Sequence, residues 1–251
     1  MRVFSNSIPK CGSFLLLKAI RKMVGPKRYS ADIDGSCQLV EMPPIQRMEG
    51  KIKIFDTMPD NHLMFGHQMN NEKIMKIIRD KGIITFIIVR DPRDVVISRF
   101  YHERSFGKCV RYNRFRSIPP QEAIKEVIYH VEGPKVNNVW VDATNEKLNI
   151  SEYFKSFSMF WRSDYVNVIR FEDLVGPLGG GSQEKQMQTL RFIRNKLGSS
   201  ADIEQIASRL FGGPITFRKG QIGEWAREMS DENKELVNKV AEDVIKELGY
   251  E

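Results

Sequence analysis

Two segments of the sequence combine basic and hydroxyl side chains at a turn that follows an apolar run. Pro9-Lys10-Cys11-Gly12-Ser13 follows the predicted short strand at 3–8, and Arg90-Asp91-Pro92-Arg93-Asp94, leading to Ser98, follows the apolar residues at 83–89. Helical spacing begins after each turn. The N-terminus of a helix presents unpaired N–H groups and a partial positive charge, which favour a bound anion. Two such places in one chain predict a ligand that is anionic at both ends.

The first turn contains the groups of a short phosphate cradle. Gly12 lets the backbone approach a ligand closely, Ser13 offers a hydroxyl, and Lys10 brings a mobile ammonium. The segment does not match the G-x-x-x-x-G-K-[ST] pattern of nucleotide-binding P-loops, because its lysine precedes the glycine. Taken alone, it also fits an ordinary connection between a strand and a helix.

The second turn has a more specific local pattern. The continuous apolar run at 83–89 is rich in β-branched residues, which predicts a strand covered on both faces in a parallel sheet. Asp91 can cap the next helix and Pro92 suits its first position. Arg90 then lies at the carboxyl end of a central strand, where open α/β sheets bind ligands, and Ser98 follows two turns later. The alternative is that Arg90 pairs with Asp91 or Asp94 and only braces the helix.

Together with two further segments, these turns resemble the sulfotransferases that use PAPS (3′-phosphoadenosine 5′-phosphosulfate). Residues 9–13 resemble the family's 5′-phosphosulfate loop, and residues 90–98 resemble its 3′-phosphate motif. Residues 217–225 resemble the Arg-Lys-Gly-x-x-Gly-x-Trp segment that closes over the same 3′-phosphate. Residues 168–174 resemble the strand that carries an aromatic-Glu-Asp-Leu signature. The four motifs stand in the family's order and span roughly residues 5–225.

The resemblance implies a set of residues that bind the donor. They are Lys10, Cys11, Gly12, Ser13 and Phe14 at the 5′ end, and Arg90, Ser98, Arg218, Lys219 and Gly220 at the 3′-phosphate. Ser13-Phe14-Leu15 stands where many cytosolic members have Thr-Thr-Trp, so the usual adenine-stacking tryptophan is missing. Phe171 and Phe217 are the candidates to stack adenine, because any aromatic face can stack a base. Both also suit an ordinary hydrophobic core.

A sulfuryl transfer also needs a base for the acceptor hydroxyl, and histidine has a suitable pKa. The chain has four histidines, at 62, 67, 102 and 130. The catalytic histidine of the family lies between the first loop and the arginine motif, so the resemblance implies His67, with Lys10 as the second catalytic group. His62 is the second candidate for the base. His102, one turn past Ser98, is a weaker one.

The rest of the pattern predicts a single α/β domain over residues 1–251. We expect a P-loop-like fold with a mostly parallel sheet of four or five strands and helices on both faces, since 251 residues with 41% hydrophobic composition can bury one substantial core. Residues 51–56 are predicted as an edge strand, and residues 30–50 and 103–150 as substrate cap or lid segments. Residues 176–181 are predicted to form a mobile loop. Further helices are predicted at 119–130, 151–162, 182–197 and 230–248.

Charge and composition limit the classes of binding partner that we expect. The net charge of +7 suggests an anionic partner, but no nucleic-acid signature is present. Basic residues interleaved with aromatics between Arg104 and Arg116 fit either a solvated face, a polyanion track or the entrance for an acidic acceptor. No apolar stretch reaches membrane-spanning length and no signal-peptide pattern opens the chain, so we expect a cytoplasmic protein that does not span the membrane. Cys11, Cys37 and Cys109 have no metal-ligand spacing, and we expect no metal requirement.

The predicted reaction is transfer of a sulfuryl group from PAPS to a hydroxyl, or as second choice an amine, with release of PAP (3′-phosphoadenosine 5′-phosphate). The expected acceptor is a small molecule, lipid, glycan or carrier-bound group, and a homodimer is an expected assembly. Two alternatives stay open. One is a P-loop-type kinase, and the other is a noncatalytic protein that binds PAP or a polyanion.

Overall fold

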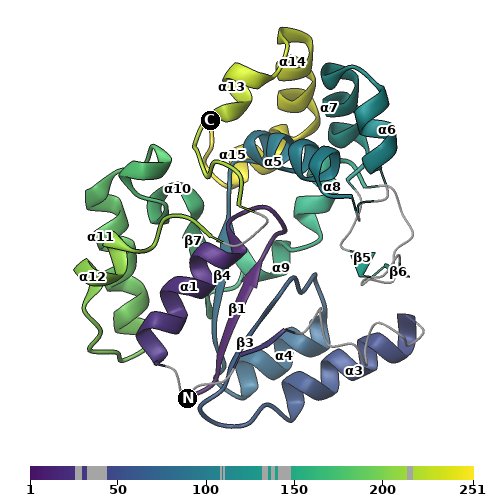
Figure 1. Ribbon diagram of the computed structural model, residues 1–251. Helices are drawn as coiled ribbons and strands as arrows, with labels where there is room; N and C mark the ends of the chain where they lie inside the picture. The colour runs from purple at the N-terminus through teal and green to yellow at the C-terminus, as the bar shows by residue number, and fades with distance from the viewer. Residues whose placement is uncertain are drawn as a thin grey trace.

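A five-stranded parallel sheet forms the centre of the computed structural model (Figure 1). The structure describes residues 1–25, 30–32, 44–107, 109, 111–131, 135–136, 139–140, 148–213 and 217–251. The strands are β1 (Val3–Ser7), β2 (Ser30–Asp32), β3 (Leu63–Gly66), β4 (Ile84–Val89) and β7 (Val166–Arg170), in the order β2-β3-β1-β4-β7. Every pair is parallel. The predicted α/β class with a parallel sheet is therefore confirmed.

Helices cover both faces of this sheet, as predicted (Figure 1). One face carries α1 (Ser13–Val24), α10 (Phe171–Leu174), α11 (Gln183–Lys196) and α12 (Ile203–Ser208), and the other carries α3 (Pro44–Asp56), α4 (Glu72–Asp80) and α9 (Ser158–Trp161). The helix α4 shows why these residues form helices. Its Asn71 side chain caps the start by accepting from the Ile74 amide (3.0 Å), and Ile74 and Ile78 are buried on one face.

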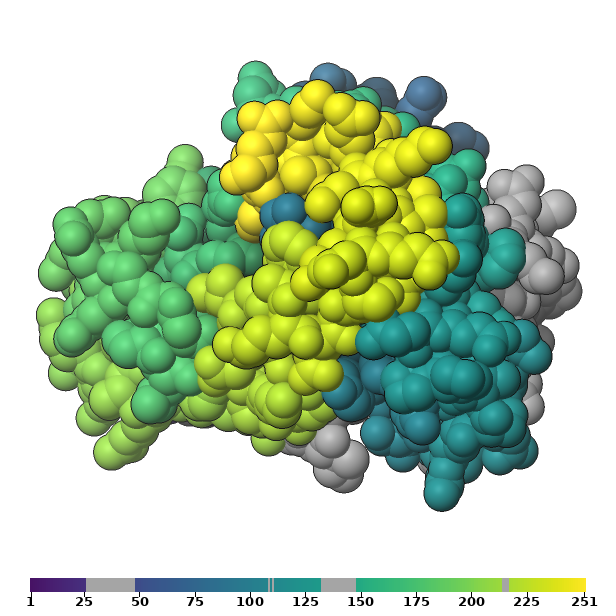
Figure 2. Space-filling view, turned by 90° about the horizontal axis from the view of Figure 1, so that it is seen from above, coloured from purple at the N-terminus to yellow at the C-terminus, as the bar shows by residue number. Residues whose placement is uncertain are grey.

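A second group of helices packs beyond the carboxyl ends of the strands. It comprises α5 (Pro92–Ser105), α6 (Tyr112–Ser117), α7 (Pro120–Tyr129), α8 (Ile150–Lys155), α13 (Glu224–Glu228), α14 (Asp231–Val240) and α15 (Glu242–Glu247) (Figure 1). Seen from this side, the yellow C-terminal residues lie over the centre of the face (Figure 2). The short elements are the 3₁₀ turn η1 (Pro177–Gly179) and the antiparallel pair β5 (Lys135–Val136) and β6 (Val139–Trp140).

The predicted edge strand at residues 51–56 is wrong, because these residues belong to α3. The alternation of lysine and isoleucine over 51–54 imitates a strand. Met48, Ile52 and Phe55 nevertheless repeat at helical spacing and pack on the core, so burial favours the helix. The predicted helices at 151–162 and 230–248 are each divided in two, into α8 and α9 and into α14 and α15.

Two further predictions need refinement. The Phe-Glu-Asp-Leu residues form the helical turn α10 after β7, and not part of the strand. The segment at 176–181 was predicted to be a mobile loop, but it contains η1 and is tied to the C-terminal part of the chain. The Ile222 amide donates to the Gly179 carbonyl (3.0 Å), and the Gln221 side chain donates to the Leu178 carbonyl (2.8 Å).

Parts of the predicted cap segments lie outside the described residues, namely 33–43, 108, 110, 132–134, 137–138 and 141–147. The rest of the two segments contributes β2, the first half of α3, α6, α7, β5 and β6, among others. Their role as a cap stays a prediction, as does the single-domain division. Within the described ranges, no helix combines the length and apolar character needed to cross a membrane.

Candidate functional site

The sheet brings the predicted site segments to one edge. Because all the strands are parallel, their carboxyl ends meet at the same side. Asn6 of β1 lies opposite Gly66 of β3 and Ile87 of β4, so the loop containing Lys10, the residue His67 and the residue Arg90 follow three neighbouring strands. The two predicted anion sites are therefore adjacent in space.

The loop between β1 and α1 is held in an unusual backbone conformation. Lys10 has φ 74° and Gly12 has φ 100°, both in the left-handed region, which costs little only for glycine. A Cβ at Gly12 would lie 2.7 Å from Cδ2 of Phe171, so the loop approaches that ring as closely as its backbone allows. Cys11 is fully buried, and burial raises the pKa of its thiol. The thiol is thus a packing group in this structure.

Lys10 lies in a partly buried, cationic environment. Burial, followed by the charges of Arg99 and Arg90, lowers the pKa of its ammonium to about 8 despite the opposing effects of Cys109 and Glu103. A bound anion next to the ammonium would remove this penalty. The electrostatics therefore fit a lysine that acquires its full charge when an anionic ligand arrives.

His67 is oriented by the last residue of β1. Its Nδ1 lies 2.8 Å from the Ser7 carbonyl oxygen and 3.0 Å from Ser7 Oγ. A carbonyl can only accept, so Nδ1 carries the proton and Nε2 keeps its lone pair. The Ser7 hydroxyl donates to Ser13 Oγ (2.8 Å), which links the histidine to the first loop.

A buried asparagine holds this arrangement. Asn6, with 0% exposure, accepts from the Gln68 amide (2.8 Å) and donates to the Gln68 carbonyl (2.9 Å), which fixes the residue next to His67. Sequence reasoning missed Asn6 and Gln68. The only signal was an amide side chain within a buried strand, where each polar group needs a partner.

The other candidate histidines lie in different surroundings. The carbonyl of His62 accepts from the Val3 amide (2.9 Å), which places His62 at the amino ends of the strands, on the opposite edge from the loop. His102 lies on α5 and stacks on Phe106, with ring centroids 5.3 Å apart. Burial, together with the charges of Lys10 and Arg99, lowers the pKa of His102 to about 4. The structure therefore brings His102, and not His62, into the neighbourhood of Lys10.

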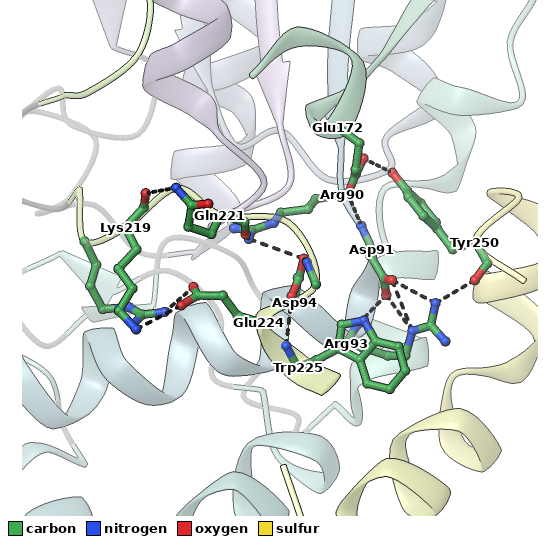
Figure 3. Close-up of polar contacts among 12 residues, drawn as sticks. Arg90, Asp91, Arg93, Asp94, Glu172, Lys219, Gln221, Glu224, Trp225 and Tyr250 are labelled. Carbon is green, nitrogen blue, oxygen red and sulfur yellow. Dashed lines mark hydrogen bonds and ion pairs between the residues drawn. The ribbon is translucent and has the colours of Figure 1, made fainter. Parts of the chain in front are cut away.

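Arg90 is buried at the end of β4, with 5% exposure. Its Nη2 donates to the Gln221 carbonyl (2.6 Å) and lies 3.5 Å from Asp94 Oδ2, as Figure 3 shows. Its guanidinium carbon lies 4.3 Å from the centroid of the Phe171 ring. The bracing pair with Asp94 is thus present. Ser98 is half-buried, and its hydroxyl has no hydrogen-bond partner among the residues that the structure describes.

The turn that contains Arg90 is supported by residues that sequence reasoning missed. Glu172 of α10 accepts from the Asp91 amide (3.0 Å) and from the Tyr250 hydroxyl (2.8 Å). Arg93 donates to the Tyr250 carbonyl (2.6 Å) and pairs with Asp91 (2.8 Å), all visible in Figure 3. Burial raises the pKa of Glu172, although these hydrogen bonds oppose the effect. The end of the chain therefore packs under the second anion site.

The predicted C-terminal motif, residues 217–225, lies against α5. Asp94 accepts from the Gly223 amide (2.8 Å) and from the Trp225 amide (3.1 Å). Arg218 pairs with Glu224, and its guanidinium carbon lies 4.0 Å from the centroid of the Tyr101 ring. These contacts bring the motif of Arg218 to the helix α5, which begins two residues after Arg90.

Lys219 and Gly220 complete the motif. The Lys219 ammonium lies 3.3 Å from Glu224 Oε1 and 3.5 Å from Glu228 Oε1. Gly220 has φ 61°, and a Cβ there would lie 2.6 Å from the Phe217 ring. The glycine is therefore needed for both the backbone conformation and the close packing of Phe217.

The aromatic candidates for adenine binding differ in exposure. Phe171 is 4% exposed beneath Arg90 and Gly12, so its ring is not presented to a ligand in this structure. Phe217 is 40% exposed and meets Phe211 edge to face. Phe14 is 47% exposed and lines an open pocket of about 370 Å³ together with Leu17, Lys18, Arg21, Lys22, Gly212 and Gly213.

The basic and aromatic run after α5 does not form one exposed stripe. Arg111 is buried and pairs with Glu103 (2.6 Å), while Arg114 pairs with Glu126. Arg116 lies against Tyr112, with its guanidinium carbon 5.3 Å from the ring centroid, and donates to the Tyr112 hydroxyl. Lys108 lies outside the described residues, and so does Cys37. Since much of this positive charge is already paired, the run offers little support for a polyanion track. In the part of the chain that is described, no group of three or more potential metal ligands occurs.

Comparison with known proteins agrees with this geometry. A family model described as a sulfotransferase domain matches residues 2–180. The chain is 23% identical to sulfotransferase 6B1 of Mus musculus over 240 residues, covering 93% of this chain and 73% of that protein. It is 24% identical to sulfotransferase 6B1 of Homo sapiens over 255 residues, covering 94% and 74%.

Solved structures of similar fold include mouse sulfotransferase SULT7A1 complexed with PAP, with a TM-score of 0.63 at 16% identity, covering 96% of this chain and 85% of that one. A retinol dehydratase in complex with androsterone and PAP has a TM-score of 0.60 at 14% identity, covering 98% and 82%. Both confirm the predicted fold. Because the family model covers most of its length, the chain belongs to the sulfotransferase domain family, and the predicted enzyme class is confirmed.

Proposed function

We propose that the chain transfers a sulfuryl group from PAPS to a hydroxyl acceptor and releases PAP. One observation carries the assignment. Three groups meet at the carboxyl edge of one parallel sheet. They are Lys10, whose backbone is in the left-handed region, His67, whose ring is oriented by Ser7, and Arg90, which follows the neighbouring strand β4. A similar structure, that of mouse SULT7A1, is complexed with PAP, which supports a donor of this kind.

The first loop would bind the 5′ end of the donor. The amides of Gly12, Ser13 and Phe14 lie at the start of α1, where a helix presents donors to an anion. The Cys11 amide already donates to the Ile8 carbonyl (3.0 Å), so it would shape the loop. Lys10 would neutralise charge on the oxygen that bridges phosphate and sulfuryl group. We place the 3′-phosphate near Arg90, Ser98, Arg218, Lys219 and the Gly220 amide.

Adenine would lie against the exposed aromatic residues near the pocket on α1. Phe14 lines that pocket, and Phe217 packs beside Gly213 on its rim. Aromatic rings of this exposure can stack a base. Phe171 is a weaker candidate, because Arg90 already occupies its face.

The chemical step would be an in-line transfer. His67 Nε2 would take the proton of the acceptor hydroxyl as its oxygen bonds to sulfur, while the bond between sulfur and the bridging phosphate oxygen breaks. Lys10 and the loop amides would stabilise the negative charge on the departing PAP. Positioning and charge stabilisation would supply most of the rate enhancement, as in phosphoryl transfer.

The acceptor would be a hydroxyl-bearing small molecule, lipid, glycan or carrier-bound group, or as second choice an amine. The structure of the retinol dehydratase with androsterone shows that a protein of this fold accommodates a small alcohol. The half of α5 after Ser98 would border the acceptor, since His102 and Arg99 lie in the electrostatic range of Lys10. A cytoplasmic location, a cap role for residues 30–50 and 103–150, and a homodimer belong to this proposal.

Thermal unfolding distinguishes this function from a nucleotide kinase. PAP in excess EDTA should raise the unfolding temperature, because a ligand that binds only the folded state stabilises it by mass action. ATP with magnesium should give a smaller shift at the same concentration. A shift that occurs only with ATP and magnesium would favour the kinase and reject the proposal.

A further inference from the structure

The cations expected to bind the 3′-phosphate are already paired with carboxylates in the structure. Arg90 faces Asp94 at 3.5 Å, and Arg218 pairs with Glu224. Lys219 lies 3.3 Å from Glu224. Figure 3 shows Lys219 and Glu224 side by side. A dianion that reaches this place therefore meets a charge-balanced cluster and must compete with the protein's own carboxylates.

The two carboxylates differ in how firmly they are held. Asp94 accepts from the Gly223 and Trp225 amides in addition to pairing with Arg90, so it has backbone partners independent of any side-chain cation. Glu224 is bound only through cationic side chains among its described contacts. Its side chain is 4% exposed, and its Oε1 has no hydrogen-bond partner in the described part of the chain. Of the two, Glu224 is the carboxylate that can exchange a cation.

Arg218 is placed to change partners. Its side chain is 29% exposed, its guanidinium carbon lies 4.0 Å from the centroid of the Tyr101 ring, and its Nη2 pairs with Glu224. A guanidinium binds a phosphate through the same forked edges that bind a carboxylate, so the two anions compete for it. A buried carboxylate left without any cationic partner would have an unfavourable desolvation free energy. Lys219, 3.3 Å away, can remain as the counterion of Glu224.

We infer that Glu224 competes with the 3′-phosphate of the nucleotide for Arg218. Without nucleotide, Glu224 pairs with Arg218. When the nucleotide binds, Arg218 pairs with the phosphate and Lys219 remains as the counterion of Glu224. This inference rests on the proposed function. It assigns Glu224 a role in nucleotide selectivity. The affinity for PAP is reduced by the cost of breaking the pair between Arg218 and Glu224, whereas AMP, which has no 3′-phosphate, does not break it.

Calorimetric titration of PAP and AMP into wild-type protein and Glu224→Gln tests this inference. The glutamine keeps the size of the side chain and removes the charge. We expect PAP to bind about tenfold more tightly to the variant, because Arg218 is released from its partner, while the AMP affinity changes less than about threefold. Glu228→Gln is the matched control, because Glu228 contacts Lys219 and Tyr101 but not Arg218. Its PAP affinity should stay within about threefold of wild type.

The outcomes separate the two proposals. Weaker PAP binding by Glu224→Gln, or equal tightening for PAP and AMP, would overturn the competitor role while leaving the proposed function intact. Absence of PAP binding by wild type would overturn the proposed function and this inference with it. If Glu224→Gln does not fold, Glu224→Asp replaces it. The shorter carboxylate reaches Arg218 less well and should tighten PAP in the same direction, and unchanged or weaker PAP binding would contradict the inference.

Discussion

The hydroxyl of Tyr250 donates a hydrogen bond to Glu172, 78 residues earlier in the chain, at 2.8 Å. The other oxygen of Glu172 accepts from the Asp91 amide at 3.0 Å. One buried carboxylate thus connects the end of the chain to the turn that carries Arg90. Burial raises the pKa of Glu172, so the two donors are needed to keep its charged form in place.

Tyr250→Phe should lower the free energy of unfolding by about 1–3 kcal/mol, because it leaves one oxygen of a buried carboxylate without its donor. Urea denaturation measures the change. Tyr129→Phe is the control, since Tyr129 is 42% exposed, and its stability should stay near wild type. Equal stability of Tyr250→Phe and wild type would show that Glu172 does not depend on the tyrosine.

His67→Ala should lower turnover by about two to four orders of magnitude, the usual contribution of a positioned general base, with little change in PAP affinity. His62→Ala is the matched control, because His62 lies at the opposite edge of the sheet, and we expect near-normal turnover. Steady-state rates and PAP titrations measure both effects. Normal turnover by His67→Ala would identify a structural role and direct attention to His102.

The pKa of Lys10 predicts a proton uptake on binding. Burial lowers this pKa to about 8 from its unfolded value of 10.5, so the charged form is disfavoured in the fold. Below pH 8 this penalty on stability is fully present, and it is relieved as the pH rises towards 10.5. An anionic ligand favours the charged ammonium of Lys10 again. Near pH 8.5 the protein should therefore take up protons when PAP binds, and PAP should bind more weakly as the pH rises further.

Calorimetry in two buffers of different ionisation enthalpy, at pH 8.5, measures that uptake. Lys10→Arg should remove most of it, because a guanidinium stays charged throughout this range. A binding enthalpy that does not depend on the buffer would contradict a titrating Lys10.

Gly12→Ala should destabilise the fold by roughly 2 kcal/mol or more, because it combines a left-handed backbone with a Cβ 2.7 Å from the Phe171 ring. Gly25→Ala is the matched control. Gly25 has φ 79°, but none of the described residues has an atom within 4 Å of its added Cβ, so only the backbone cost applies there. Thermal unfolding of both variants should show a larger loss for Gly12→Ala, and equal losses would mean that the Phe171 ring moves aside.

Local patterns predicted the parts of the site that depend on local structure. The apolar run at 83–89 and the Asp91-Pro92 start of the helix follow from near neighbours, and the structure has both β4 and the cap, with Asp91 accepting from the Arg93 amide (2.9 Å). The assignment of 51–56 failed because a short alternation is weaker than the burial of Met48, Ile52 and Phe55 on a helix that starts at Pro44.

Contacts between distant segments could not be predicted in this way. Nothing near Tyr250 indicates that its partner is Glu172, and nothing near Glu224 distinguishes its pair with Arg218 from an exposed ion pair. The resemblance to a family identified which residues to examine. It did not reveal that Arg90 and Arg218 already have carboxylate partners in the protein itself.

Transfer of a labelled sulfuryl group from PAPS to an acceptor tests the central claim most directly. Wild-type protein should transfer the labelled sulfuryl group to at least one acceptor in a screen of phenols, alkyl alcohols, glycans, glycolipids and carrier-bound acyl chains. PAP should form in equal amount, and His67→Ala should lose most of this activity. A reaction without added acceptor measures any transfer to water. The opposite result is that the protein binds PAPS but releases PAP no faster than the uncatalysed rate, with every acceptor and with water. That result would contradict the enzymatic function and identify a noncatalytic binding protein.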